Sequence, residues 1–224
     1  MPQLIAMIII VVGAMIYMFQ TFGGTGDKIE GIAQKTSIIT EINNIKNGIQ
    51  IASRGGEVIV GTTLEDLANV GYFAQQINDQ LTDTRSNAAN ENIYNAISFG
   101  GQVVTAADNT SNMQISLVTP TAANPNARPG IFVNLSEGNL ANNAGFLETQ
   151  IANDLAAIAS IDRTATTATA VDLDVNGDVP VANAPTTVTN TAGNAGTVAV
   201  GTATLTDGMF TIYFKDIPAG INLN

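Results

Sequence analysis

Three residue types are missing from this chain of 224 residues, and each absence excludes a kind of chemistry. Without cysteine, the chain forms no disulfide and offers no thiolate to a metal. Without histidine, it lacks the commonest general base and the commonest ligand of transition metals. Tryptophan is also absent, and neither a G-x-S-x-G turn nor a phosphate-binding loop occurs. We therefore expect that the protein is not an enzyme and needs no cofactor.

Basic residues are also scarce. The chain has 8 Lys and Arg against 19 Asp and Glu, which gives a formal charge of −11. Proteins that bind nucleic acid rely on clustered Lys and Arg, so we predict no nucleic-acid partner. A strongly acidic chain instead suits a soluble outer surface that repels its copies.

Charge is absent from the start of the chain up to Asp27. Residues 4–19 are an almost unbroken run of Ile, Val, Met, Ala and Leu, with Gln3 and Gln20 at its edges, and a helix needs about 20 mostly apolar residues to cross a bilayer. No basic residue precedes this run and no small-residue cleavage site follows it, so it does not fit a cleavable secretory signal. We predict a transmembrane helix over 1–22.

A second helical pattern follows a glycine break at 23–26 and covers 27–54. This half is amphipathic, because its apolar residues recur at steps of three, four or seven. The predicted apolar face consists of Ile29, Ile32, Ile39, Ile42, Ile45, Ile49 and Ala52. Gly55 and Gly56 are expected to end the helix.

The remaining residues, 55–224, are enough for one globular head with its own core. The fold class that we predict is α+β, with a mostly antiparallel sheet behind the long N-terminal helix. Helices are expected over 64–81 (with a break near Gly71) and 140–161, and a helical turn over 87–97. Strands are expected over 57–60, 102–105, 113–118, 131–135, 171–175, 198–205 and 209–214.

An apolar helix that continues into an amphipathic one, with an α+β head behind it, resembles the type IV pilin superfamily. The resemblance covers residues 1–54 and extends to the rest only in general architecture; the Met1 start is most similar to the type IVb branch. It implies that a prepilin peptidase and a pilus assembly machinery act on the chain. It also implies that the apolar helices leave the inner membrane and pack into the core of an extracellular filament, with the heads outside.

One position departs from the family. Pilins usually carry Glu at the fifth mature position, thought to neutralise the terminal amine of a neighbour, and this chain has Ile5 there. Archaeal and some minor pilins lack the same Glu, so the departure bears on the bacterial branch more than on the superfamily.

Packing physics favours assembly independently of the resemblance. A protein that is only anchored in the membrane needs no more than its membrane-spanning segment. The apolar stripe of a helix that extends beyond the membrane must instead be buried against other residues. The head is expected to cover the upper part and neighbouring copies the lower part, through a head-to-tail contact that forms an open polymer. The predicted assembly residues are Leu4, Ile5, Ile8, Ile9, Val12, Ile16, Phe19, Phe22, Ile29, Ile32, Ile39 and Ile42.

Two other functions remain open. The chain is alternatively a single-pass surface binding module, such as a receptor or adhesin, that stays in the membrane. It is also compatible with a minor pseudopilin of a secretion or uptake system, which forms short assemblies of low abundance.

The one sharp polar motif is D-L-D-V-N-G-D. Acidic and amide side chains alternate before a glycine, as in the first half of a calcium-binding loop, at Asp172, Asp174, Asn176 and Asp178. Asn183 replaces the bidentate Glu that closes an EF-hand loop. The alternative is a strand that ends in an Asn-Gly hairpin turn.

Two sequons, at Asn109 and Asn134, are candidate N-glycosylation sites. Such triplets also arise by chance in a chain so rich in Asn and Thr.

Overall fold

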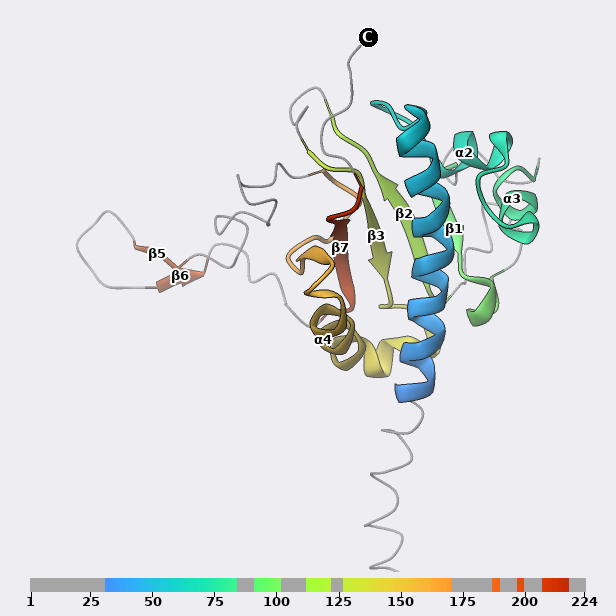
Figure 1. Cartoon of the computed structure of the whole chain (residues 1–224). Helices are drawn as coiled ribbons and strands as arrows, with labels where there is room; N and C mark the ends of the chain where they lie inside the picture. The colour runs from blue at the N-terminus through green and yellow to red at the C-terminus, as the bar shows by residue number, and fades with distance from the viewer. Residues whose placement is uncertain are drawn as a thin grey trace, which may run out of the picture.

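A computed structural model describes residues 31–83, 91–101, 112–121, 127–170, 187–189, 197–199 and 207–217. Within them the fold is α+β, with a long helix lying across one face of an antiparallel sheet (Figure 1). The predicted fold class is confirmed at this level. No helix among these residues is long and apolar enough to cross a membrane. The predicted span, 1–22, the glycine break at 23–26 and residues 27–30 lie outside the described residues.

The long helix is described over 31–55. It ends where the sequence predicts, because Gly56 has a positive φ of 78° that glycine adopts without steric cost. The amide of Glu57 then donates to the carbonyl of Ala52 at 3.0 Å. Gly48 allows the helix to approach the head closely, since a Cβ at this position would collide with the ring of Phe73.

Five strands form the sheet, in the order β1-β2-β3-β7-β4, and all neighbours are antiparallel. They are β1 (Ile93–Asn95), β2 (Gln114–Val118), β3 (Gly130–Asn134), β4 (Ala159–Asp162) and β7 (Met209–Phe214). The predicted strands at 113–118, 131–135 and 209–214 are confirmed as β2, β3 and β7. A separate pair of short strands, β5 (Thr187–Thr189) and β6 (Thr197–Ala199), lies within the threonine-rich segment.

Residues alternate between the two faces of the sheet. On β7, Phe210, Ile212 and Phe214 belong to the main core beneath the long helix, whereas Tyr213 belongs to a small cluster with Val118 and Phe132 on the opposite face. The main core also takes its members from the helices and from Ile38 to Ala52 of the long helix. The upper part of the long helix is therefore an integral part of the head.

Two short helices follow the long one, α2 (Leu64–Val70) and α3 (Gln75–Leu81). Thr63 and Asp66 form a capping box at the start of α2, and Gly71 ends the helix in the left-handed conformation, at the break that the sequence predicts. The predicted strand over 57–60 is wrong. Gly56 and Gly61, both with positive φ, bracket this segment, and the hydroxyl of Thr62 closes it into a loop through the amide of Ile59 at 2.8 Å.

The helix predicted over 140–161 is shorter than expected. The chain forms a 3-10 helix, η2 (Gly138–Asn143), then α4 (Ala144–Leu155), and then β4. Residues 159–162 pair with β7 along the open edge of the sheet, and this pairing prevails over the apolar helical spacing. Ile158, predicted on the buried helix face, is 46 % exposed in the turn between α4 and β4.

The helical turn predicted over 87–97 is also wrong for the part that is described. Residues 93–95 form β1, which pairs with β2, and a 3-10 helix, η1 (Ile97–Phe99), comes after it. The side-chain amide of Gln80 bonds both backbone groups of Asn95: its nitrogen donates to the carbonyl and its oxygen accepts from the amide, each at 2.9 Å. These two hydrogen bonds attach the edge strand to α3. The predicted strands over 102–105 and 171–175 lie outside the described residues, and only Thr197–Ala199 is described as a strand near 198–205.

Candidate functional site: the outer face of the long helix

The long helix directs its charged side chains toward the head. Over residues 31–53 these are Lys35, Glu41 and Lys46. Lys35 Nζ lies 2.7 Å from Asp154 of α4, and Lys46 Nζ lies 2.8 Å from Asp216, just after β7. Each of the two lysines is thus neutralised by a carboxylate from the head.

Glu41 is buried at 3 % exposure. Its carboxylate accepts hydrogen bonds from the hydroxyl of Tyr94 and from the amide of Ser98, both at 2.8 Å. Burial raises the pKa of Tyr94 well above its usual range, so the phenol keeps its proton and donates. A buried carboxylate needs such partners, and here they attach β1 and η1 to the helix.

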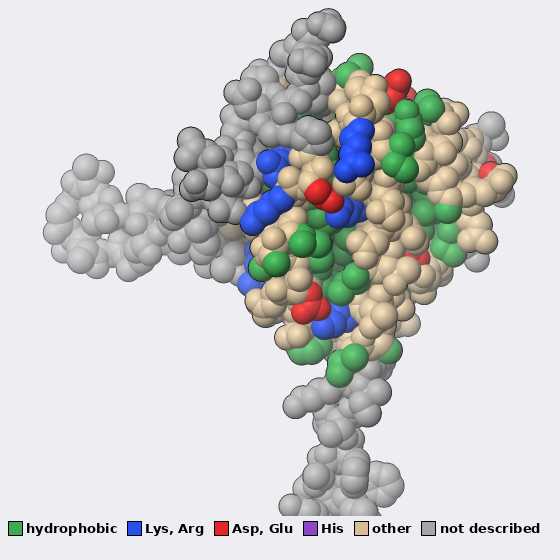
Figure 2. All heavy atoms as spheres, viewed as in Figure 1, with side chains coloured by type: hydrophobic (Ala, Val, Ile, Leu, Met, Phe, Trp, Pro, Cys, Tyr) green, Lys and Arg blue, Asp and Glu red, His purple; other side chains and the backbone are tan. Residues whose placement is uncertain are grey.

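The outer face of the helix is uncharged over the same length. Surface helices usually place charged and polar residues toward the solvent, so this face is atypical. In Figure 2 the surface over the long helix is mostly tan and green, with the blue side chains concentrated to its left. Its exposed residues are Ile32, Ala33, Thr36, Thr40, Asn43, Asn44, Asn47 and Ile51.

Two threonines on this outer face have their hydroxyl groups satisfied within the helix. Thr36 Oγ1 donates to the carbonyl of Ile32 at 3.2 Å, and Thr40 Oγ1 donates to the carbonyl of Thr36 at 2.9 Å. This bond to the residue four positions earlier satisfies the hydroxyl donors of both threonines. The lower outer face can therefore enter a dry contact without losing a hydrogen bond to water.

The predicted apolar stripe is divided between two environments. Ile42, Ile45, Ile49 and Ala52 are fully buried in the chain's own core, whereas Ile32 is 59 % exposed and Ile39 is half-buried. Ile42, which we expected at an assembly contact, is thus already covered by the head. The other predicted assembly residues lie outside the described residues: Leu4, Ile5, Ile8, Ile9, Val12, Ile16, Phe19, Phe22 and Ile29.

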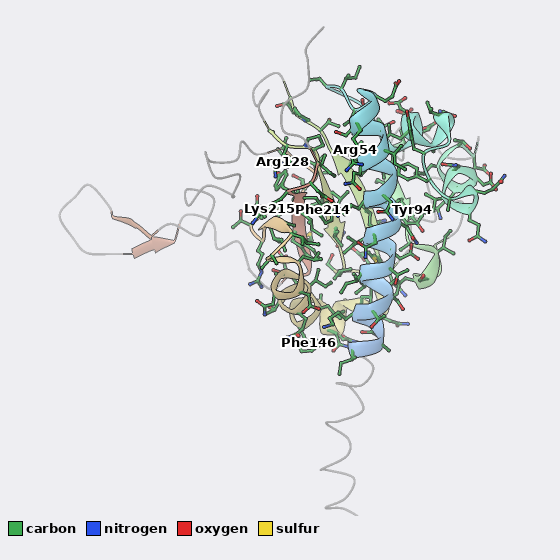
Figure 3. All side chains as sticks on the ribbon, viewed as in Figure 1. Arg54, Tyr94, Arg128, Phe146, Phe214 and Lys215 are labelled. Carbon is green, nitrogen blue, oxygen red and sulfur yellow. The ribbon has the colours of Figure 1, made fainter. Side chains whose placement is uncertain are left out.

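A basic patch lies to one side of the helix, where Arg54, Arg128 and Lys215 surround the end of β7 (Figure 3). Lys46 lies over the ring of Phe214, 4.7 Å from its centroid, and Arg128 Nη1 donates to the Phe214 carbonyl at 3.4 Å. We call Lys46, Arg54, Arg128 and Lys215 the basic patch.

An acidic region lies on the other side, around α2. Residues 56–83 and 91–101 contain six Asp and Glu and neither Lys nor Arg. Burial, together with the neighbouring carboxylates of Glu91 and Asp66, raises the pKa of Glu65. The carboxylates of Glu65, Asp66 and Glu91 therefore repel one another.

A groove of about 340 Å³ opens beside α2. Its rim carries the carboxylates of Glu57 and Asp66, and its lining includes Ile59, Val60 and Val70, which are exposed by 52 %, 39 % and 63 %. We call this the acidic groove. Exposed aliphatic walls beneath acidic rims are suited to a long cationic side chain.

A second buried carboxylate, Glu148 of α4, stabilises the fold. It is fully buried, accepts a hydrogen bond from the amide of Gly208 at 2.9 Å, and contacts Arg163 Nε at 2.6 Å. Burial raises the pKa of this carboxyl, against the opposing effect of Arg163. Both oxygens bind the segments that flank β4 and β7, so Glu148 fixes α4 to the sheet.

The other predicted sites are only partly within the described residues. Asp172, Asp174, Asn176, Asp178 and the sequon at Asn109 lie outside them. Within the described ranges, no group of three acidic residues is arranged to hold a metal ion. Asn134 is half-buried at the end of β3, and its side-chain oxygen accepts hydrogen bonds from the amide and hydroxyl of Ser136. The calcium and glycosylation sites stay predictions.

Sequence reasoning missed the uncharged outer face and the role of Ile38. The buried positions 38, 42, 45, 49 and 52 alternate steps of four and three, which is the clearer core spacing. Ile32 and Ile39 are seven residues apart, so they lie above one another on a different side of the helix, which faces outward and to one side of the buried face. The signal for the outer face was therefore present, in the lack of charge at 32, 33, 36, 40, 43, 44, 47 and 51.

Comparison of the chain with models of known protein families, with curated proteins and with solved structures finds no match.

Proposed function

We propose that this chain is the structural subunit of an extracellular, type IV pilus-like helical filament. In this proposal, residues 1–22 are held in the membrane before assembly and form the filament core afterwards. A prepilin peptidase and an assembly machinery process and export the chain. The head, including the upper part of the long helix, forms the outer surface.

The observation that carries the proposal is the lack of charge on the lower outer face of the long helix, around Ile32, Thr36 and Thr40. Lys35, Glu41 and Lys46 have partners within the chain, although water would solvate all three without cost on an ordinary surface helix. A helix gains from such an arrangement when its outer face packs against other helices, because unpaired charges are costly to bury there. Small and β-branched residues on that face, Ala33, Thr36 and Thr40, also permit close approach.

The arrangement of the head supports the same proposal. The described helix begins at the lower margin of the head, at residue 31, and Ile32 lies there with 59 % of its surface exposed (Figure 1). Phe146 of α4, which is 46 % exposed, lies near this lower margin in Figure 3. In the sequence, the apolar run 1–22 precedes this point. Two exposed apolar side chains, Ile32 and Phe146, therefore lie at the end of the head where the described part of the helix begins.

The test compares two single substitutions of the full chain in the producing organism. Ile32→Lys places a charge on the lower outer face, whereas Ile51→Lys places the same charge at an equally exposed position of the same helix, 58 % against 59 %. Material sheared from the cells is viewed by electron microscopy and identified by mass spectrometry. We expect wild type and Ile51→Lys to give thin fibres made of this chain. We expect Ile32→Lys to give none, because an unpaired Lys would lie in the packed layer.

The other outcomes point to different functions. Fibres from Ile32→Lys in wild-type amount would show that the outer face does not pack. Wild-type protein that stays in the membrane pellet, with no fibres, would favour the anchored binding module. Short, rare assemblies in which this chain is a minor component would favour a pseudopilin.

A further inference from the structure

The helix α4 carries an exposed aromatic side chain beside the lower end of the long helix (Figure 3). Phe146 is 46 % exposed, and no other Phe or Tyr among the described residues is exposed to this degree. Its ring lies against the first described turn of the long helix, because a Cβ added at Gly31 would lie 3.1 Å from a ring carbon. The next residue, Ile32, is also exposed. We call Gly31, Ile32 and Phe146 the α4 shoulder.

Two polar contacts fix α4 beside the long helix and therefore fix the place of the α4 shoulder. Lys35 Nζ lies 2.7 Å from the carboxylate of Asp154. The side-chain nitrogen of Asn143 donates to the side-chain oxygen of Gln34 at 3.4 Å. A ring held in this way loses little further freedom when it enters a contact, and aromatic rings are frequent anchors of protein interfaces.

The surface of α4 next to the α4 shoulder has no charge that lacks a partner. The helix contains two charged residues, Glu148 and Asp154. Glu148 is fully buried, and Asp154 is bonded to Lys35 of the long helix. Because unpaired charges are costly to bury, a surface with this distribution is suited to an apolar partner.

The sequence contains an apolar segment that needs such a partner outside the membrane. Residues 4–19 are an almost unbroken apolar run, and the described helix begins at residue 31, beside the ring of Phe146. Between them, residues 23–30 contain three glycines and the charged Asp27, Lys28 and Glu30. The residues that directly precede Gly31 in the same copy are therefore mostly glycine or charged. The apolar run of a neighbouring copy is not separated from the α4 shoulder in this way.

We propose that the α4 shoulder binds the apolar N-terminal segment, residues 1–22, of a neighbouring copy. This inference rests on the proposed function, and it adds α4 to an assembly surface that the sequence placed only on the N-terminal helix. The contact is heterologous, because a head meets an N-terminal segment, so each copy offers one surface of each kind and the contact propagates.

The first test compares two full-length variants in the producing organism. Phe146→Lys places a charge on the α4 shoulder, whereas Ile158→Lys places the same charge just beyond the other end of α4, at an equal exposure of 46 %. We expect Phe146→Lys to lower the yield of sheared fibres at least about tenfold, because an unpaired Lys would face an apolar segment. Ile158→Lys should assemble like wild type. Membrane-fraction abundance and protease resistance show whether each variant folds.

The second test identifies the occupant by disulfide cross-linking, which has no background because the chain lacks cysteine. One chain carries Phe146→Cys, and a second chain carries a cysteine at Leu4, Val12 or Phe19 in turn. Both are co-expressed with the wild-type chain so that fibres form, and the sheared fibres are oxidised. We expect mass spectrometry to find a disulfide between the two chains for at least one of the three positions. Ile158→Cys in place of Phe146→Cys should give none.

Three results would overturn the inference while wild-type fibres leave the proposed function intact. The first is a wild-type yield of fibres from Phe146→Lys. The second is the lack of any disulfide between the two chains. The third is a disulfide that forms only when both cysteines are in one chain, which would make the chain's own N-terminal segment the occupant. Absence of fibres from the wild type would instead contradict the proposed function, and this inference with it.

Discussion

The long helix and the α2–α3 edge differ in how their charged side chains are placed and paired. On the helix, over residues 31–53, each charged side chain is bonded to a partner in the head and the outer face is neutral. Around α2, acidic residues accumulate, and burial and mutual repulsion raise the pKa of Glu65. The two regions lie side by side, since Gly48 of the helix packs directly against Phe73, between α2 and α3.

The contrast indicates different environments for the two surfaces. A helix face without charges loses less when it leaves water than an acidic edge does, because ionised groups cost the most to bury. In the proposed filament, the lower part of the helix face meets other helices.

The largest effect on the free energy of unfolding is expected from substitutions that compare the buried face of the long helix with its outer face. Ile45→Ala removes a fully buried side chain and should lower the free energy of unfolding by about 2–5 kcal/mol. Ile51→Ala, at 58 % exposure, should change it by less than about 0.5 kcal/mol. Denaturant unfolding of the full chain in detergent measures both. Similar losses for the two variants would show that the outer face is already covered within one copy.

A smaller effect is expected from removing the partner of the buried helix charge. Tyr94→Phe deletes the hydroxyl that donates to Glu41 at 2.8 Å and accepts from the amide of Ile97 at 3.3 Å. Both groups lose a partner in the core, so we expect a loss of about 1–3 kcal/mol in the same unfolding measurement. Tyr72→Phe, at a half-buried position of the neighbouring edge, is the control and should change stability by less than about 0.5 kcal/mol. A Tyr94→Phe variant as stable as this control would mean that Glu41 does not depend on the phenol.

Much of the fold follows from local patterns in the sequence. The end of the long helix at Gly56, the capping box of α2 and the strand over 209–214 were predictable, because each depends on a few adjacent residues. The end of α4 was not, because the spacing of Leu147, Ile151 and Leu155 continues to Ile158. There the outcome depends on pairing with β7, about fifty residues later in the chain, which no local pattern contains.

The candidate site was predictable in part. The apolar spacing identified a helix that needs a cover, but it could not assign each Ile to the head or to a neighbour, because that depends on where the sheet lies. Ile42 and Ile32 belong to the same predicted stripe, yet one is fully buried and the other is 59 % exposed. The partners of Lys35 and Lys46 are more than a hundred residues away in sequence, so neither ion pair had a local signal.

The smallest effect is expected at the acidic edge, where Glu65→Gln removes a charge that lies beside the carboxylates of Glu91 and Asp66. The pKa of Glu65 is raised in the folded chain, so the folded state holds this proton more tightly than the unfolded state does. Stability due to this group is therefore present below about 4.5, the ordinary Glu value, and is lost as pH rises through the raised folded value. Glu65→Gln should thus melt slightly above wild type at neutral pH and together with it below pH 4.5.

The gain from Glu65→Gln should stay below about 0.5 kcal/mol, because the residue is only half-buried and the N-terminus of α2 favours a negative charge. Thermal unfolding of the full chain across this pH range measures it. A variant that melts below wild type at neutral pH would show that Glu65 has a cationic partner within its own chain. The charge of the acidic edge would then be compensated within the chain, as the charges of the long helix are.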